Sequence, residues 1–293
     1  MAGQLKEVRN RIKSVQNTQQ ITKAMKMVSA AKLRKAQEAI IQMRPYARKL
    51  QEILTNIVSN SEGEIGMELA SERSMEKILF VVITSDRGLS GAYNANIIKL
   101  AKQTIKEKYN SQDSKGNVHI WSIGKKGFEH FTKNKFKVNA DYKDLFIHLT
   151  FENVQSSSQA AVKAFKDKEF DIVELVYSEF KNAATQRFIV ERYLPIPKLQ
   201  KKQGVKQNDF IYEPGKEELI AELMPKILNT QLFKAVLDAS ASEHGARMTA
   251  MDKATENADD LLRTLKISYN RARQAAITTE LTEIVSGAAA LQG

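Results

Sequence analysis

A long glycine-free stretch at the start of the chain limits its possible folds more than any other feature. Between Leu5 and Val58 there is no glycine and one proline, Pro45. Apolar residues recur there at alternating steps of three and four, which is the spacing along the contact face of paired helices. At about 1.5 Å per residue the stretch predicts a helix of roughly 80 Å, with a kink at Pro45, that needs a second helix as cover. The predicted contact positions are Leu5, Val8, Ile12, Val15, Leu33, Ala36, Ile40, Met43, Ala47, Leu50, Leu54 and Ile57.

The apolar contact face is interrupted in the middle of this helix. The same heptad phase falls there on the polar or charged residues Gln19, Thr22, Lys26 and Ser29. A displaced apolar row consists of Ile21, Ala24, Val28 and Ala31. We expect something other than the partner helix to pack on this row. A stutter that merely rotates the helix within the supercoil is the alternative.

The last part of the chain, from Glu217 to Ala290, repeats the helical pattern with smaller side chains. Alanine and serine let two helices approach closely, so the two ends of the chain predict a long antiparallel coiled coil. Pro225 and Gly245 are the weak points of this second helix. Its predicted contact positions are Met251, Ala254, Ala258, Leu261, Leu265, Ser268, Ala272 and Ala275.

The middle of the chain alternates apolar strand patterns with amphipathic helix patterns. Such alternation predicts βαβ units, and therefore an inserted Rossmann-like α/β domain with a mostly parallel sheet. The predicted strands are Lys77–Asp86, Val118–Ile123, Phe170–Tyr177 and Arg187–Tyr193. The predicted helices are Ala92–Lys108, Phe128–Phe136 and Ala160–Lys168. We expect three domains: an N-terminal helix over residues 1–60, the α/β domain over 76–212 and a C-terminal helix over 213–293.

Composition excludes several classes of function. The chain has no cysteine and four histidines, which excludes disulfides and thiolate chemistry and disfavours a metal site. No stretch approaches the roughly 20 apolar residues that cross a bilayer, so direct membrane insertion is not expected. The net charge of +11 is concentrated in residues 1–60. That basic helix lacks the interleaved aromatics and groove-reading motifs of nucleic-acid binders, and we expect it to face an acidic protein surface.

Few residues are candidates for catalysis or cofactor binding. The loop Ser85–Gly91 follows the first predicted strand, where a doubly wound sheet would bind a nucleotide. It matches neither GxGxxG nor GxxxxGK[ST], and a tight turn that starts a helix explains it better. The segment Gly124–Gly127 is a weaker candidate still. Glu243 and His244 lack the HExxH pattern of a metal site and are expected to be exposed. We therefore predict no catalytic, cofactor-binding or metal-binding residue.

The chain ends on a charge-free segment, Ile284–Gly293, of small and aliphatic residues. A frayed terminus in water usually carries charges. Enclosure in an apolar sleeve and simple fraying are the two interpretations.

Three segments carry extended motifs at both ends and in the middle of the chain. They are IKSVQNTQQITKAMKMVSAAKLRKAQ (Ile12–Gln37), SDRGLSGAYN (Ser85–Asn94) and the run from Ser242 to Leu291. Together they closely resemble the gamma subunit of F-type ATP synthases. The resemblance implies that the two long helices form a central shaft inside a hexamer of alternating alpha and beta subunits. It also implies that the α/β domain lies at the foot of the shaft, against the epsilon subunit and the ring of c subunits.

The resemblance assigns partner contacts to particular residues. Lys23, Ala24 and Met25 match the motif KAM, which faces acidic loops of the beta subunit. Lys26 follows directly and is expected to contact beta as well. Arg273 and Gln274 match the RQ pair on the other helix, which also contacts beta. A third group, Phe210, Tyr212 and Glu213, matches the segment near epsilon and the c ring.

The same resemblance implies a function without chemistry in this chain. Rotation of an asymmetric shaft would present different faces to three catalytic sites in turn, and so couple proton movement through the c ring to ATP synthesis or hydrolysis. The chain departs from many members at Ser90, where they have cysteine, and at Gly245, where they have alanine. It also lacks the inserted regulatory cysteines of chloroplast members, and its motif begins close to Met1. We therefore expect a bacterial, peripheral protein at the cytoplasmic face of the inner membrane.

Two other classes of function are kept as alternatives. One is a free-standing coiled-coil scaffold, or a nucleic-acid-binding protein, with a nucleotide-regulated α/β domain. Nucleic acid that stays bound in high salt would favour it. The other is an oxidoreductase, which would need a dinucleotide-binding motif that the sequence lacks.

Overall fold

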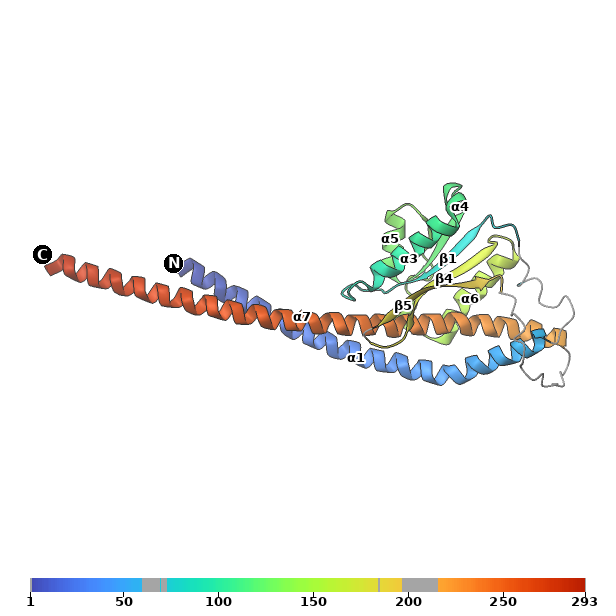
Figure 1. The fold of residues 1–293 in the computed structure, drawn as a ribbon, viewed down its shortest axis with the longest axis horizontal. Coiled ribbons are helices and arrows are strands. Elements are labelled where there is room, and N and C mark those ends of the chain that lie inside the picture. The colour runs from blue at the N-terminus through green and yellow to red at the C-terminus, as the bar shows by residue number, and fades with distance from the viewer. Residues whose placement is uncertain (1, 60–68, 70–72, 184, 197–215, 293) are drawn as a thin grey trace. The chain divides into compact units, whose positions relative to one another are not determined.

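The computed structural model describes residues 2–59, 69, 73–183, 185–196 and 216–292. They divide into two compact units, and both long helices contribute to each. The helix-pair unit comprises Met1–Ser29 and Arg247–Gly293, and the α/β unit comprises Ala30–Ala246. Helix α1 covers Ala2–Ser59 and helix α7 covers Lys216–Gln292. α1 continues through Pro45 and bends along this part of its length (Figure 1), and α7 continues through Pro225 and Gly245.

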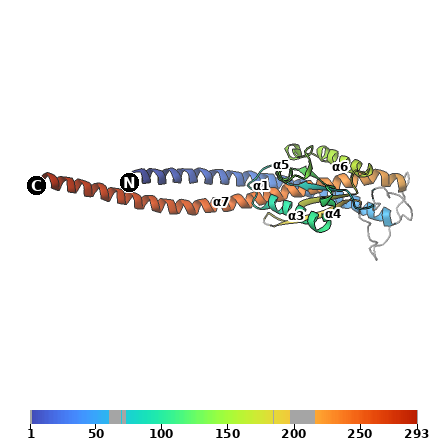
Figure 2. The same cartoon turned by 90° about the horizontal axis from the view of Figure 1, so that it is seen from above.

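The helix-pair unit consists of the first part of α1 and the last part of α7, which lie side by side in both views (Figures 1 and 2). Gln19 contacts Asp259, and Lys26 contacts Asp252. Moving up the sequence of α1 therefore moves down the sequence of α7. The predicted antiparallel pairing of the terminal helices is confirmed.

The α/β unit is built on a five-stranded sheet in the order β3-β2-β1-β4-β5. β1 pairs in parallel with β2 and β4, and β2 pairs in parallel with β3. Only β5, which is antiparallel to β4, departs from this direction among the described strands. The predicted, mostly parallel sheet is therefore confirmed. Its strands are β1 (Ile78–Ile83), β2 (Val118–Ile123), β3 (Lys137–Asn139), β4 (Ile172–Phe180) and β5 (Gln186–Leu194).

Helices cover both faces of this sheet (Figure 1). The bounds are α3 (Tyr93–Lys108), α4 (Asn110–Ser114), α5 (Lys125–Lys133), the 3-10 helix η1 (Leu145–His148) and α6 (Phe151–Lys166). One core cluster joins the sheet to Ile97 of α3 and Phe131 of α5. The other joins it to Phe165 of α6 and to Leu228 and Leu232 of α7. Burial of apolar side chains on both faces gives the three-layer arrangement of Rossmann-like folds.

Sequence reasoning placed helix α6 nine residues too late. The helix begins after Thr150, whose hydroxyl accepts a hydrogen bond from the backbone N–H of Asn153 at 3.3 Å. This cap is a start signal that the prediction overlooked. The first turns also bury polar residues, because Ser158 shares a hydrogen bond of 2.6 Å with the hydroxyl of Tyr193. Buried serines interrupt the apolar period on which the prediction relied.

Small residues let α7 run deep inside the α/β unit. From Ala235 to Ser242 every residue is buried, and Tyr93 donates a hydrogen bond of 3.0 Å to the carbonyl oxygen of Ala239. A methyl group on Gly245 would lie 3.2 Å from the Cα atom of Ala183. Glycine at this departure from the family pattern therefore lets α7 approach the connection between β4 and β5 closely.

One carboxylate on this buried part of α7 is held in an unfavourable environment. Asp238 is buried and accepts a hydrogen bond from the backbone N–H of Phe180. The pKa of Asp238 is raised to about 6, mainly because burial removes its hydration and also because Glu179 is near, while Lys234 and Arg44 oppose the rise. Burial disfavours the charged form of a carboxyl group. The charged state of Asp238 therefore costs the fold stability at neutral pH.

We predict that this cost makes stability depend on pH. The folded state binds the proton of Asp238 more tightly than the unfolded state does, so stability should fall as pH rises from 3.8 through about 6. Asp238→Asn, which keeps the hydrogen-bond acceptor, should flatten this dependence and add on the order of 2 kcal/mol to the free energy of unfolding at pH 7. Urea titrations across this pH range measure it. The exposed Asp113→Asn is the control, and equal pH profiles for both variants would contradict the prediction.

Candidate partner interface

The polar stretch of α1 faces α7 directly. Thr22 and Ser29 are buried, and the Thr22 hydroxyl lies 2.8 Å from the Thr255 hydroxyl in a shared hydrogen bond. Gln19 donates to Asp259, and Lys26 forms an ion pair with Asp252. The buried and half-buried positions of α1 keep the same spacing through this stretch, so the helix is not rotated. Its heptad phase continues, and polar pairs replace apolar ones.

The partner residues on α7 were missed because the predicted register of that helix was wrong at alternate positions. Met251, Ala258 and Leu265 are buried as predicted. Between them the contact positions are one residue later than expected: Leu262 is 7% exposed, whereas Leu261 is 40% exposed. Steps of three and four are both compatible with one helix face, so a regular alternation of the two steps cannot tell Leu261 from Leu262. The polar pairing of Thr255 with Thr22 decides the register instead.

Polar pairs inside a helix contact specify register more than they add stability. Lys26 and Asp252 are both partly exposed, so their ion pair is worth little by itself. Arg9 adds a further fixed point, because its guanidinium donates to the hydroxyl of Tyr269 at 2.9 Å. These contacts hold α1 and α7 in one alignment. They determine which side chains are left facing outward.

We predict that Lys26 acts mainly within this chain. Lys26→Asp should destabilise the chain by about 1 kcal/mol, because it places two carboxylates opposite each other. Adding Asp252→Lys should restore most of that loss. Lys23→Asp, one turn away and exposed, is the matched control and should change the free energy of unfolding by less than about 0.5 kcal/mol. Urea unfolding of the four proteins measures this, and failure of the charge swap to rescue would refute the assigned pair.

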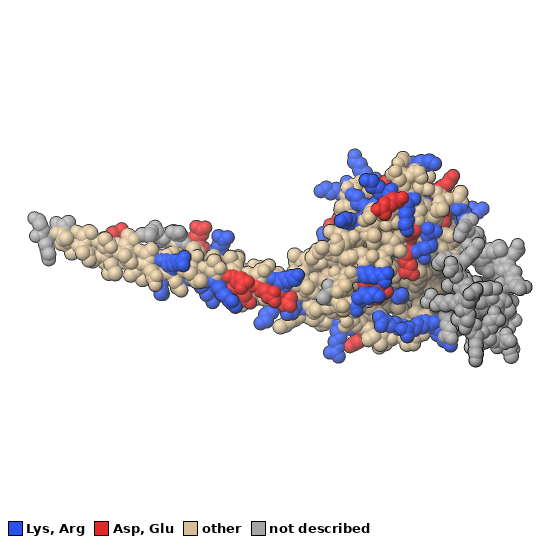
Figure 3. Space-filling view, in the orientation of Figure 1, with Lys and Arg blue, Asp and Glu red and all other residues tan. Residues whose placement is uncertain are grey.

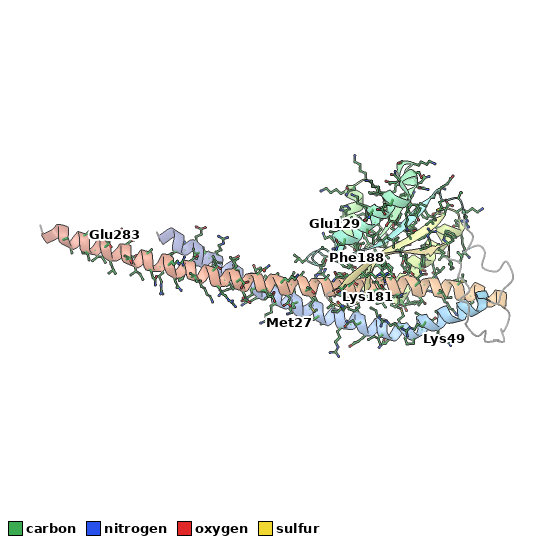
Figure 4. All side chains as sticks on the ribbon, in the orientation of Figure 1. Met27, Lys49, Glu129, Lys181, Phe188 and Glu283 are labelled. Atoms are coloured by element: carbon green, nitrogen blue, oxygen red, sulfur yellow. The ribbon has the colours of Figure 1, made fainter. Side chains whose placement is uncertain are left out.

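The displaced apolar row of α1 is exposed in the part of the chain that the structure describes. Ile21 is 59% exposed and Val28 is 57% exposed. Met27, which Figure 4 labels on α1, is 63% exposed, and Ala24 and Ala31 are exposed as well. A row of large apolar side chains along one helix face marks an interaction surface more often than a solvated one.

A second uncovered row follows on α7 toward the C-terminus. The large apolar side chains Ile277, Leu281, Ile284 and Val285 are all exposed, and they recur at helical spacing. Glu283, labelled in Figure 4, is also exposed in this stretch. The helix pair thus exposes large apolar side chains, and it also carries basic and acidic side chains on its surface (Figure 3). This is the character of a surface that is buried in a larger assembly.

The residues predicted to contact a beta subunit differ in their surroundings. Lys23 is exposed, Met25 is partly buried, and Lys26 is partly buried in its ion pair with Asp252. Arg273 and Gln274 are exposed on α7. Thus Lys23, Arg273 and Gln274 are the members of the set whose side chains are most available to a partner. The predicted epsilon and c-ring contacts, Phe210, Tyr212 and Glu213, lie outside the described residues.

The candidate phosphate loop bonds to the chain's own atoms. At the N-terminus of α5, the backbone N–H of Lys125 donates to the Asp86 carboxylate at 3.2 Å. The next two N–H groups donate to Ser85 and Thr84 at 3.0 and 2.8 Å. A helix N-terminus with free N–H groups is what attracts phosphate. Here the Asp86 carboxylate, the Ser85 carbonyl and the Thr84 hydroxyl accept these bonds, so the turn after β1 is tied to the segment Gly124–Gly127.

The same loop explains two further sequence features. The side-chain amide of Asn94 donates to the Ser85 hydroxyl at 2.7 Å and reaches the Ser90 hydroxyl at 3.4 Å. Ser90, the departure from the cysteine of many family members, is therefore a buried polar member of the turn. Leu89 adopts a positive φ of 63° and is exposed. The tip of the loop therefore combines backbone strain with an exposed apolar side chain.

The expectation that Glu243 and His244 are exposed was wrong. Glu243 is buried and His244 is partly buried, because α7 is packed on most sides along this stretch of the α/β unit. Across the part of the chain that the structure describes, no group of three or more His, Cys, Asp or Glu side chains could hold a metal ion. Within that same part, no helix is both long enough and apolar enough to cross a membrane.

Comparison with known proteins gives one consistent result. The family model described as ATP synthase matches residues 4–291. The ATP synthase gamma chain of Cytophaga hutchinsonii is 53% identical over 291 residues, covering 98% of both chains. That of Flavobacterium johnsoniae is 51% identical over 289 residues, covering 99% of both chains.

Solved structures show the same fold at lower sequence identity. A chain of the Euglena gracilis mitochondrial ATP synthase rotor has a TM-score of 0.65 and 21% identity, covering 94% of this chain and 100% of that one. A chain of the same synthase in another rotational state has a TM-score of 0.68 and 20% identity. The match covers 99% of this chain and 95% of that one. Taken with the family match over nearly the full length, these likenesses show that the chain belongs to the ATP synthase gamma chain family.

Proposed function

We propose that this chain is the central rotor shaft of a bacterial F-type ATP synthase. The shaft would turn inside the hexamer of alpha and beta subunits and couple proton movement through the c ring to ATP synthesis or hydrolysis. The observation that supports this most is the antiparallel helix pair, whose own contacts leave large apolar side chains and several charges facing outward. The relatives from Cytophaga hutchinsonii and Flavobacterium johnsoniae, which match nearly the full length at 53% and 51% identity, are ATP synthase gamma chains. The chain would do no chemistry of its own.

The asymmetry of the helix pair is what would allow coupling. One side carries the row Ile21, Met27 and Val28, and other sides carry basic or acidic residues. Three equivalent sites around such a shaft would meet different surfaces at any moment. A rigid-body rotation would then exchange those surfaces among the sites. Polar pairs such as Lys26–Asp252 would keep the two helices from sliding under load.

The beta contacts would come from exposed residues on both helices. Lys23 would meet acidic loops of beta, with Met25 beside it, and Arg273 and Gln274 would form the matching contact from α7. Lys26 would support these residues from within the helix pair and contact beta only with the part of its side chain that Asp252 leaves accessible. Contacts with epsilon and the c ring through Phe210, Tyr212 and Glu213 follow from the family resemblance. So does a peripheral position at the cytoplasmic face of the inner membrane.

The uncovered C-terminal row leads to a prediction of limited loss. Deleting residues 284–293 removes Ile284 and Val285 but leaves the buried contacts of Leu262 and Leu265. We expect assembly to survive and ATP-driven proton pumping, normalised to hydrolysis, to fall about twofold, because part of the apolar contact is lost. Native gels and pumping assays on vesicles measure both quantities. Complete loss of assembly would contradict this prediction and would show that residues 284–293 are required to hold the chain in the complex.

Reconstitution tests the proposed function. The full chain is mixed with alpha and beta subunits of the same source, and the complex is isolated by size exclusion. We expect one chain per hexamer and ATP hydrolysis that requires its presence. A variant with Ile21, Met27 and Val28 changed to serine should fold alone but join the hexamer poorly. The proposal would be contradicted if the hexamer formed without binding this chain and hydrolysed ATP equally well in its absence.

A further inference from the structure

The α/β unit carries a large groove between α3 and α5 that the proposed shaft contacts do not use. It encloses about 1340 Å³ and is lined along α3, α4 and α5 as far as Phe136. Small-molecule pockets usually enclose about 300 to 1,000 Å³. A larger, open groove between two helices is suited to a segment of a macromolecule, such as a helix of about 10 Å diameter.

Apolar side chains form the floor of this groove. Ile98 and Ile105 of α3 line it and are buried, and Phe136 beyond α5 lines it with its ring at 5.5 Å from that of Phe131. An apolar floor favours a ligand that presents aliphatic side chains. A small inorganic anion would gain nothing from it.

Lysines line the groove on both sides. Lys99, Lys102 and Lys106 follow one another along α3 at steps of three and four, so they share one face of that helix. Lys126 and Lys133 stand on α5. Lys126 is paired with Glu129, which Figure 4 labels, and the three acidic lining residues leave an excess of positive charge. Basic side chains are also frequent on the surface of this part of the unit (Figure 3).

A histidine in the same groove has an unsatisfied ring atom. The Nε2 atom of His130 is buried and has no hydrogen-bond partner among the described residues. Burial lowers the pKa of His130, and the charges of Lys102 and Lys133 lower it further. Buried polar atoms in folded proteins are nearly always paired. A carboxylate bound beside the imidazole would offset the charges of Lys102 and Lys133 and so favour the charged form of His130.

We propose that this groove is a docking site for an acidic amphipathic helix of a partner protein. The aliphatic stripe of that helix would lie on Ile98, Ile105 and Phe136. Its carboxylates, at steps of three and four, would meet the lysine row of α3, whose spacing they match. His130 would lie beside the bound helix. The site belongs to the α/β unit alone and does not depend on the beta contacts proposed above.

Nuclear magnetic resonance of the full chain tests this docking site. The probe is a synthetic peptide of about 20 residues, long enough for a helix of about 30 Å, with leucine on one face and glutamate flanking it. We expect the ring signals of His130 to shift and the pKa of His130 to rise when the peptide binds, since nearby carboxylates favour the charged imidazole. Affinity should fall steeply as salt is added. The same peptide with glutamine in place of glutamate should not bind.

Two pairs of variants distinguish the groove from general attraction to a basic protein. Lys102→Glu with Lys133→Glu should weaken the peptide at least tenfold, and Lys102→Gln with Lys133→Gln should weaken it less. The matched control, Lys163→Glu with Lys253→Glu, removes two exposed lysines elsewhere and should leave the affinity unchanged. Thermal melting checks that all variants fold. Equal affinity for both Glu pairs, or peptide binding without a change at His130, would overturn the proposal. A His130 shift reproduced by inorganic phosphate would also overturn it, in favour of a small-anion site.

Discussion

Replacing Gly124 by alanine should destabilise the chain by about 4 kcal/mol or more, among the largest effects expected of a single methyl group. Gly124 joins β2 to α5 with a φ of 99°, a conformation that side chains with a Cβ atom rarely adopt. The added Cβ atom would lie 2.2 Å from the carbonyl oxygen of Thr84. That oxygen belongs to the chain just after the central strand β1, so it cannot move away without disturbing the sheet.

Urea unfolding of the full chain measures this loss, and a second glycine provides the control. Gly88 lies in the neighbouring loop, and a Cβ atom there would meet nothing within 4 Å. Gly88→Ala should therefore change the free energy of unfolding by less than about 1 kcal/mol. Similar, small losses for both variants would show that the turn around Gly124 relaxes easily. The close approach of Gly124 to the Thr84 carbonyl would then not exclude a side chain at this position.

Reversing the charges of Lys23 and Arg273 together should reduce coupling about tenfold while leaving the isolated chain intact. Both side chains are exposed, so their replacement by glutamate should change the free energy of unfolding by less than about 1 kcal/mol. At an interface with acidic loops the same change would create like-charge contacts, which cost several kcal/mol. The readout is ATP-driven proton pumping divided by ATP hydrolysis, in reconstituted vesicles.

A salt series and a control variant make this coupling test specific. The defect should be largest at low ionic strength, because salt screens charges beyond about 8 Å at physiological strength. Lys163→Glu on α6 is also exposed but is not assigned to the shaft surface, and should pump normally. An unchanged pumping ratio for the Lys23 and Arg273 double variant at low salt would show that these side chains face solvent and make no contact with beta.

Elements with uninterrupted apolar patterns were predicted closely from the sequence. The strand predicted at Val118–Ile123 has the same bounds in the structure, because Gly116 and Gly124 on either side end the pattern. Strand β3 was missed: it has three residues, lies at the edge of the sheet and is only partly buried. A strand that short leaves almost no period to recognise.

The polar contacts of the helix pair could not be found from hydrophobic spacing. Thr255 was passed over for Ala254, since an apolar residue normally marks the buried position. The structure places Thr255 against Thr22 and Asp252 against Lys26. The available signal was complementarity: in an antiparallel register, polar residues on one helix meet polar residues on the other. The positions of the polar contacts can therefore be predicted only by aligning the two helix sequences against each other, and not from the pattern of either helix alone.

The candidate site was only partly accessible to sequence reasoning for a related reason. Family motifs identified Lys23, Arg273 and Gln274, which are exposed. They could not show that Lys26 is held by Asp252, because that depends on the register. The basic groove was not foreseen either, since its lysines come from separate helices whose approach depends on the sheet between them.

Direct observation of rotation tests the central claim of a turning shaft. The chain has no cysteine, so a single cysteine in place of the exposed Lys163 would give one attachment point for a visible bead. The hexamer of alpha and beta subunits is fixed to a surface with the labelled chain in place, and ATP is added. We predict that the bead turns in one direction with three evenly spaced pauses per turn, and that it stops when ATP is removed. Steady ATP hydrolysis by such complexes while the bead shows only random motion would contradict the account.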